Sequence, residues 1–436
     1  MKIKNFTSLV NDVKKKGLFH LLSARILLRV LGFGSVLFVA KFLSPVELGQ
    51  IRTMQSFSML ALIVAGFGFN ISVLKLCSEK RPLEEKSSIL RQNIKFSFAS
   101  TAVSLLTLFL LAKFKVLSPD DSINQMLPIF MLSIPAGVIT SILSNYLQAL
   151  KEIKKMATVQ IIFRTIGIVS LILLTYLFGI WGYIISSVTI SYLLLPFVYK
   201  FIKQFITGSK KVASKLIFQK SFYLAKWSVA ANVIERLTRS MDILILNFLI
   251  ADRIGFGYYS LATIFLVPLR EITKSIREVA LPYFSEKQND RKEFNRVLKK
   301  YRKLMLLQSI GIAALSSIAV PLIIYLFFGE EYYSVNSYFF VLVIGFIFHS
   351  NIALLSTSLI ALGMMKFNFI STTIYLPLSL VFNYVLISYL GLIGAAIAQT
   401  FTSLAAMFII IIISKKAINK HFDSVEEKIL QGENQN

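Results

Sequence analysis

Residues 335–362, VNSYFFVLVIGFIFHSNIALLSTSLIAL, run for 28 positions without a single Asp, Glu, Lys or Arg. A helix needs about 20 apolar residues to cross the hydrocarbon core of a bilayer, so this stretch predicts a transmembrane helix. Comparable stretches recur along the 436 residues, which are 56% hydrophobic and 16% charged. The alternating segments of about ten residues that are typical of membrane strands do not occur. The sequence therefore predicts an all-α polytopic membrane protein.

The apolar stretches divide the chain into about 12 predicted transmembrane helices. They lie near residues 18–42, 49–76, 89–112, 124–150, 156–178, 181–203, 220–249, 255–283, 303–328, 335–362, 367–389 and 392–414. Residues 416–436 are polar and are expected to form a frayed tail.

The 47 Lys and Arg residues are distributed unequally between the two sides of these helices. The loops on one side carry 33 of them and the turns on the other side carry 4, and the remaining ten lie inside the predicted helices. This asymmetry follows the positive-inside rule and predicts cytoplasmic N- and C-termini. The net charge of +25 is thus explained by topology and by contact with anionic membrane lipids, so no nucleic-acid partner is expected.

Two short sequence repeats relate the first half of the chain to the second. Residues 41–50, KFLSPVELGQ, align with 247–256, NFLIADRIGF, and residues 179–185, GIWGYII, align with 391–397, GLIGAAI. Both matches fall at equivalent turns of two six-helix units. We therefore expect two six-helix bundles, residues 1–208 and 209–415, followed by a cytoplasmic tail, 416–436. Because six is even, the bundles should be related by a pseudo-two-fold axis along the membrane normal.

Ten cations lie inside the predicted helices, together with only four acids. The cations are Arg25, Arg29, Arg52, Arg164, Lys226, Arg236, Arg239, Arg270, Lys274 and Arg277, and the acids are Glu235, Asp242, Glu271 and Glu278. A cation near the bilayer centre costs roughly 2.5–3.5 kcal/mol on insertion scales. Such an excess predicts a water-filled cavity for an anionic cargo, and guanidinium groups suit phosphate or pyrophosphate.

Two readings of these charges remain open at this level. Glu235, Arg239 and Asp242 have the i, i+3 and i, i+4 spacing of a structural ion-pair network on one helix. Lys226 and Arg277 lie close enough to the cytoplasmic face to extend their charged ends toward water. Arg29 and Arg270 are the hardest to explain in either way, and for them a cavity-lining role is favoured.

Sequence motifs typical of enzymes are missing. Cys77 is the only cysteine, the three histidines are far apart, and neither a metal-binding nor a nucleotide-binding motif occurs. We therefore expect no catalytic residue, no metal and no cofactor. A membrane-embedded glycosyltransferase or polymerase should also have a large outward loop, whereas the predicted outward loops are short.

Several strings carry a resemblance to a known family. They are RILLRVLGFGSVLFVAKFLSPVELGQIRTMQSF (25–57), GFGFNISVLKLCSE (66–79), MDILILNFLIADRIGFGYYSLATIFLVPL (241–269), ALPYFSE (280–286) and GLIGAAIAQ (391–399). The pattern over 18–415 resembles the polysaccharide transporter family, whose superfamily also contains multidrug extruders and the lipid II flippase. This resemblance implies a bacterial cytoplasmic (inner) membrane protein with a cationic central cavity.

The resemblance also implies a cargo and a set of site residues. The implied cargo is an undecaprenyl-pyrophosphate-linked oligosaccharide for O-antigen, capsule or exopolysaccharide synthesis, with a polysaccharide polymerase as a further partner. By position, the resemblance implies that Arg25, Arg29, Arg52 and Arg270 line the cavity and that Asp242 is an acid often found on the seventh helix. Together with the buried charges noted above, the expected substrate-binding residues are Arg25, Arg29, Arg52, Arg236, Arg239, Arg270 and Lys274, and the candidate ion-coupling residues are Glu235 and Asp242. The alternative is a multidrug/cation antiporter of the same superfamily, whose cavity should instead favour acids.

Overall fold

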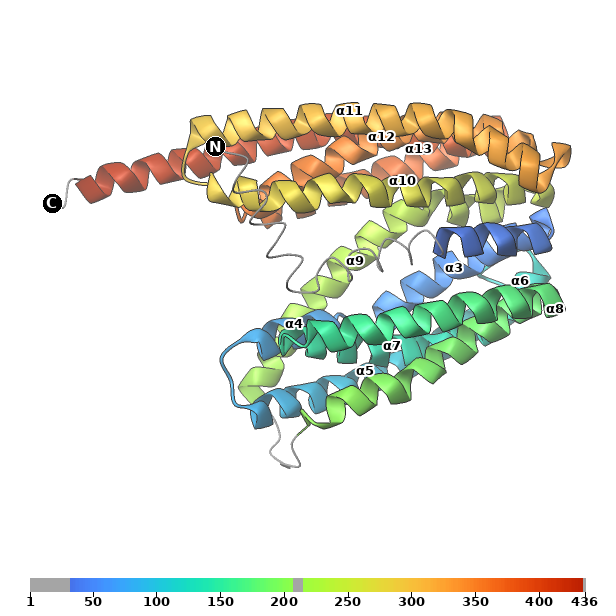
Figure 1. Ribbon diagram of the computed structural model, residues 1–436, viewed down its shortest axis with the longest axis horizontal. Coiled ribbons are helices and arrows are strands. Elements are labelled where there is room, and N and C mark those ends of the chain that lie inside the picture. Colours follow the sequence, from blue (N-terminus) through green and yellow to red (C-terminus); the bar gives the residue numbers. More distant parts are fainter. Residues whose placement is uncertain (1–31, 207–214, 434–436) are drawn as a thin grey trace, which may run out of the picture. The chain divides into compact units, whose positions relative to one another are not determined.

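The computed structural model describes residues 32–206 and 215–433. Every regular element in these ranges is a helix, as Figure 1 shows, which confirms the predicted all-α class. The chain forms two compact units, and α3 (Pro45–Gly66) and α9 (Lys215–Leu249) each contribute a part to both of them. The domain boundary expected after residue 208 lies outside the described residues and stays a prediction.

Unit 1 comprises residues 1–43 and 57–230. Besides its parts of α3 and α9, it contains an apolar helix, Gly32–Phe42, followed by α4 (Phe69–Ser78), α5 (Leu83–Lys113), α6 (Asp121–Met131), α7 (Ser133–Ala149) and α8 (Ile153–Lys203). Helix α7 packs against α4, α5 and α8. It buries Ile142, Tyr146 and Leu147, so it forms the centre of this unit.

Unit 2 comprises residues 44–56 and 231–436. It contains its parts of α3 and α9, then α10 (Arg253–Glu286), α11 (Arg291–Ile323), a π-helical turn (Ile324–Phe328), a 3₁₀ turn (Glu330–Tyr332), α12 (Ser334–Ala361) and α13 (Met365–Glu433). Helix α12 contains the charge-free stretch 335–362 and packs against α10, α11 and α13. It is the most central helix of the unit, which explains why it tolerates no charged residue.

Polar side chains define where the site-bearing helices begin. At the start of α3, the Ser44 N–H donates to the Glu47 carboxylate (2.8 Å) and the Glu47 N–H donates to Ser44 Oγ (3.3 Å), which is a capping box. At the start of α10, Asp252 accepts a hydrogen bond from the Gly255 N–H at 2.8 Å. These caps satisfy backbone donors that the first helical turn leaves open, and so they set the register of Arg52 and Arg270.

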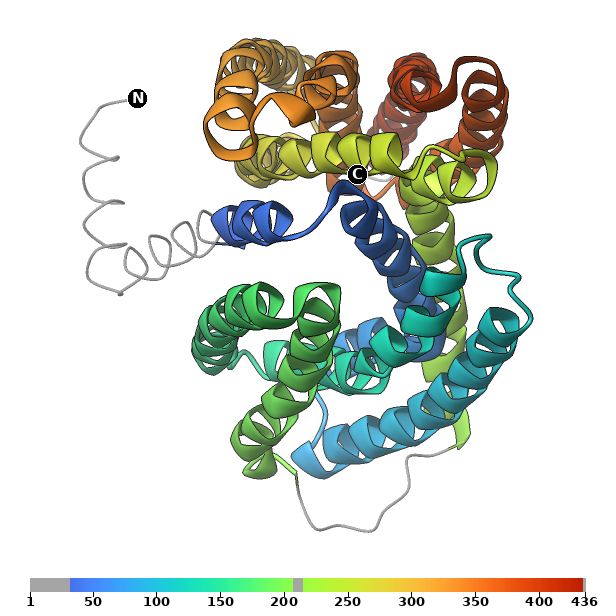
Figure 2. The same cartoon turned by 90° about the vertical axis from the view of Figure 1, so that its right-hand side faces the viewer.

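Helices α8 and α13 each consist of two helices joined by a sharp kink at a glycine. The backbone angles are φ 57°, ψ −137° at Gly179 and φ 61°, ψ −137° at Gly391. Just beyond each kink, a Cβ at Gly182 would clash with the Leu174 carbonyl, and one at Gly394 would clash with the Leu386 carbonyl. The four glycines are those of the sequence repeat, so the repeat encodes the same tight helical hairpin twice. Figure 2 shows the two parts of α13, in red, side by side.

The number of helices that are long and apolar enough to cross a membrane is lower than predicted. Among the described residues there are six such helices, or seven if the bent pair α3–α4 is one span. One predicted span, 18–42, lies mostly outside the described residues, and only its part Gly32–Phe42 is described. The rest of the difference has two physical reasons. Helices α8 and α13 each hold two predicted segments around a kink, and α9 and α10, although long enough, carry the charged residues discussed below.

The predicted frayed tail is wrong for most of its length. The second helix of α13, beyond the kink at Gly391, continues to Glu433, and Ala417, Ile418 and Phe422 are buried. Phe422 contacts Phe294 of α11 edge to face, with ring centroids 5.5 Å apart. Burial of this apolar face stabilises the helix, although the average composition of the segment is polar.

Candidate functional site

The predicted site residues that the structure describes all lie in unit 2, on α3, α9 and α10. Arg52 lies two turns into α3, where it donates hydrogen bonds to Thr263 Oγ1 (3.1 Å) and to Gln55 Oε1 (3.2 Å). Thr263 belongs to α10, so this arginine ties α3 to α10. Arg25 and Arg29 lie outside the described residues, and their expected roles stay predictions.

The only charged side chain that is fully buried in the described part of unit 2 is Asp242 of α9, at 6% exposure. It accepts a hydrogen bond from the Tyr259 hydroxyl of α10 at 2.6 Å. Tyr259 is itself fully buried, and its ring contacts Tyr338 of α12 edge to face at 5.9 Å. The buried carboxylate is therefore held by a neutral donor.

The ion-pair network expected on α9 forms only in part. Arg239 pairs with Glu235 at 2.6 Å, one helical turn earlier, and both side chains are about half exposed (48% and 51%). Asp242 makes no ion pair with any described residue and bonds to Tyr259 instead. The expected Arg239–Asp242 pairing is thus wrong, because i, i+3 spacing permits two side chains to meet but does not choose between competing partners.

Four arginines form a cationic cluster, which we define as Arg52, Arg236, Arg239 and Arg270. The charge of Arg270 interacts with those of Arg239, Arg52 and Asp242, and the charge of Arg236 interacts with those of Arg52, Arg239 and Asp242. Acids within the same range are Asp242 and Glu235. Positive charges from three helices therefore exceed the acids among them, and a cargo-binding role for these arginines stays a prediction.

Buried donor groups without acceptors distinguish this cluster from an ordinary ion-pair network. The Nε–H groups of Arg236 and Arg270, and that of Arg277 one to two turns further along α10, are buried and have no hydrogen-bond acceptor among residues 32–206 and 215–433. A buried unsatisfied donor costs about 1–3 kcal/mol, and more when the group is charged. A functional role or a bound water or ion is a usual explanation for such groups.

Two further residues lie at the edge of the cluster. His349 of α12 interacts electrostatically with Arg270, Arg239 and Arg277, so it faces the same region. Lys274 is 44% exposed and lies 4.0 Å from Glu278. Its charge is therefore partly balanced by a neighbour on the same helix.

Sequence reasoning missed Tyr259, Thr263 and His349 as parts of this site. Tyr259 and Thr263 are spaced four apart on α10, and Arg270 follows at seven, which places all three on one helical face. That spacing was the available signal. The role of His349 depends on how α12 packs, which no local pattern reveals.

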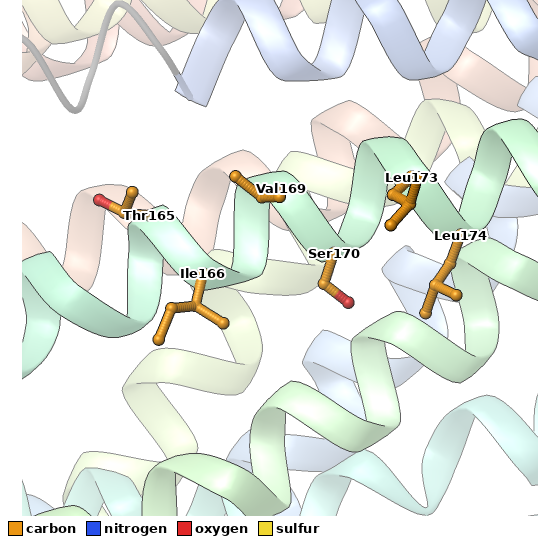
Figure 3. A pocket seen from close by; sticks show the side chains of 6 residues that line it. All are labelled: Thr165, Ile166, Val169, Ser170, Leu173 and Leu174. Carbon is orange, nitrogen blue, oxygen red and sulfur yellow. The ribbon is translucent and has the colours of Figure 1, made fainter.

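An open pocket of about 400 Å³ follows one side of the first half of α8, in unit 1 (Figure 3). Four of its six lining side chains are apolar, and the other two, Thr165 and Ser170, already hydrogen-bond to Ile161 O and to Ser186 Oγ. This pocket offers apolar surface without free polar groups. The described residues also contain no group of three His, Cys, Asp or Glu side chains placed to hold a metal ion.

Sequence comparison places residues 38–337 in a family described as polysaccharide biosynthesis proteins. A protein of Shigella flexneri assigned as an O-antigen transporter is 28% identical over 184 residues, which are 42% of this chain and 43% of that protein. The match therefore spans less than half the length of that relative.

Comparison with solved structures identifies the fold. The lipid II flippase MurJ in an inward closed conformation superposes with a TM-score of 0.74 at 19% identity, covering 93% of this chain and 90% of the other. An inward-facing multidrug transporter of the MATE family, within the MOP superfamily, gives a TM-score of 0.75 at 12% identity, covering 90% and 95%. The fold is therefore that of multi-pass membrane transporters of the MOP superfamily.

Proposed function

Because this chain belongs to the family of polysaccharide biosynthesis proteins, we propose that it is a flippase for a polyprenyl-pyrophosphate-linked oligosaccharide. It moves the cargo from the cytoplasmic to the outer leaflet by alternating access, and the sugar units serve O-antigen, capsule or exopolysaccharide synthesis. The S. flexneri relative supports a transport function, since it is assigned as a transporter of O-antigen.

The observation that carries the proposal is the cationic cluster with its buried, unsatisfied guanidinium donors. A pyrophosphate group offers several anionic oxygens, which would accept hydrogen bonds from the Nε–H groups of Arg236 and Arg270. Arginine keeps its charge at any physiological pH and can bind phosphate oxygens with two parallel donors. Arg25, Arg29 and Lys274 complete the proposed substrate-binding set.

The proposed architecture has twelve transmembrane helices in two six-helix bundles with cytoplasmic termini. The matching kinks at Gly179 and Gly391 support a duplication of one bundle, and the distribution of 33 against 4 loop cations supports the orientation. In such a duplication the cargo binds between the repeats, and rocking of the bundles exposes it to each side in turn.

Asp242 is the better of the two proposed ion-coupling residues. It is buried and bonded to a neutral tyrosine, whereas Glu235 is half exposed and already neutralised by Arg239. An intramembrane carboxylate that forms no direct ion pair is a candidate site for a coupling ion. We therefore assign the coupling role to Asp242 and a structural role to Glu235.

A cation antiporter is the second candidate, because MATE transporters share the fold. Its cargo is positively charged, so a cluster of four arginines around one buried carboxylate would repel it. The cluster therefore favours an anionic cargo.

The first test is complementation of a strain that lacks the transporter. Wild type and Arg302→Ala, which removes an exposed arginine outside the cluster, should both restore surface polysaccharide.

Arg29→Ala and Arg270→Ala should not restore surface polysaccharide, although the proteins reach normal levels, and carrier-linked units should remain on the cytoplasmic face. Arg270→Lys should restore display in part, since lysine lacks the planar fork. Full display with both alanine variants would remove the cationic-cavity mechanism, and altered resistance to cationic drugs without loss of glycan would favour the antiporter.

A further inference from the structure

A second pocket lies wholly within unit 1 and differs in chemistry from every other site described so far. Its volume is about 360 Å³, within the range of roughly 300–1,000 Å³ that is usual for small-molecule sites. It is formed by one face of α7 and by the second half of α8. The lining residues are Gly137, Thr140, Ser141, Ser144, Asn145, Ser191 and Leu194.

The depth of this pocket makes its polarity informative. The span Asp121–Ala149 has 29 residues and is long and apolar enough to cross a membrane. At 1.5 Å per residue it is about 43 Å long, so Thr140 and Ser144 fall within the ~30 Å hydrocarbon layer. Ser191 lies near the middle of the second half of α8. A group of side-chain hydroxyls and an amide at this depth is costly when it is left unbonded, so we expect this open pocket to hold water or a polar ligand.

Some polar groups of the pocket make no hydrogen bond within the described part of the protein. Ser141 Oγ accepts a hydrogen bond from Asn70 Nδ2 at 3.2 Å, and Ser191 Oγ donates to Ser187 O at 2.8 Å. Thr140 Oγ1 is buried and lacks a hydrogen-bond partner in the described part of the chain. The Asn145 amide, with two donor hydrogens and one acceptor oxygen, makes no hydrogen bond to a described residue either.

We propose that this pocket binds a neutral sugar of the lipid-linked oligosaccharide through its hydroxyl groups. Sugar hydroxyls donate and accept hydrogen bonds, which is what Ser144 and Asn145 offer, and no charged residue lines the pocket. The inference rests on the proposed flippase function and deepens it. The arginines of unit 2 would bind the pyrophosphate, whereas the pocket of unit 1 would distinguish a glycosylated carrier from a bare one.

The test measures binding of two probes to the purified full-length protein in nanodiscs. One probe is the lipid-linked oligosaccharide extracted from a strain that lacks the transporter, and the other is undecaprenyl pyrophosphate without a sugar. Wild type should bind the glycosylated probe more tightly. Ser144→Ala combined with Asn145→Leu should weaken that binding about tenfold, as expected for two lost hydrogen bonds, and leave binding of the bare carrier unchanged.

The matched control is Thr165→Val, which removes a hydroxyl of the apolar α8 pocket that is bonded only within its own helix. It should bind both probes as wild type does, and equal thermal unfolding midpoints of all variants exclude misfolding. Equal affinity of wild type for the two probes, or an unchanged affinity of the double variant for the glycosylated probe, overturns the sugar pocket but not the flippase. Failure of wild type to bind either probe overturns the proposed function itself, and with it this inference.

Discussion

At the scale of single residues, the bond between Asp242 and Tyr259 is the most consequential feature of the site. The carboxylate is 6% exposed and is held at 2.6 Å by a hydroxyl from the neighbouring helix. A buried charge is tolerated where hydrogen bonds and opposite charges compensate for the lost water. Asp242 has both, since Tyr259 donates a hydrogen bond to it and the charges of Arg236 and Arg270 act on it.

Tyr259→Phe removes that donor and leaves the ring in place. We expect a loss of about 1–3 kcal/mol in the stability of unit 2, because the carboxylate loses a buried hydrogen bond. The measurement is the thermal unfolding midpoint in detergent. Tyr338→Phe is the matched control, since the Tyr338 hydroxyl makes no hydrogen bond to a described residue while its ring contacts Tyr259. Equal midpoints of the two variants would show that the Asp242–Tyr259 bond contributes nothing.

At the scale of elements, the two helical hairpins within α8 and α13 are built by the same pair of glycines. Gly179 and Gly391 adopt backbone angles that other residues rarely adopt, and Gly182 and Gly394 let the returning helix approach a carbonyl of the first. The spacing of the glycines is identical in both hairpins. This is why a weak sequence match predicted a real structural repeat.

Alanine at Gly182 or at Gly394 should therefore destabilise the protein by about 1–3 kcal/mol, since the methyl group meets backbone and cannot be accommodated by a side-chain shift. Gly311→Ala is the control, because a Cβ at this helical position meets no atom within 4 Å. It should be neutral or stabilising by up to about 1 kcal/mol. Thermal unfolding and the yield of folded protein check both effects. A stable Gly394→Ala protein would contradict the tight hairpin.

The C-terminal helix shows what sequence reasoning overlooked at this scale. Residues 416–433 have a polar composition, yet Ala417, Ile418 and Phe422 are buried at helical spacing, and Phe422 contacts Phe294 of α11. Arg291 at the start of α11 adds an ion pair to Asp423 at 3.1 Å. Composition averages over all faces of a helix. The average for residues 416–433 is polar, so it did not reveal the one apolar face that is buried.

At the scale of the whole molecule, the class and the grouping of charges were predictable, whereas the partners were not. Long apolar stretches follow directly from bilayer thickness, and the helices that carry Arg52, Arg236, Arg239 and Arg270 were identified by their charges alone. Packing between helices that are distant in the sequence decides three partners. It brings Thr263 to Arg52, Tyr259 to Asp242 and His349 to the arginines. The polar pocket of unit 1 was missed because serine and threonine are common in membrane helices and carry no signal by themselves.

The central claim is that the cationic cluster carries an anionic lipid-linked sugar across the membrane. The most direct measurement is the rate at which purified protein in sealed vesicles moves a polyprenyl-pyrophosphate-linked oligosaccharide between leaflets. We predict rapid movement with wild type and Arg302→Ala, and a rate at least about tenfold lower with Arg270→Ala, since a charged hydrogen bond contributes about 1.5–3 kcal/mol. Equal rates for wild type and Arg270→Ala, or no movement with wild type, would contradict the account.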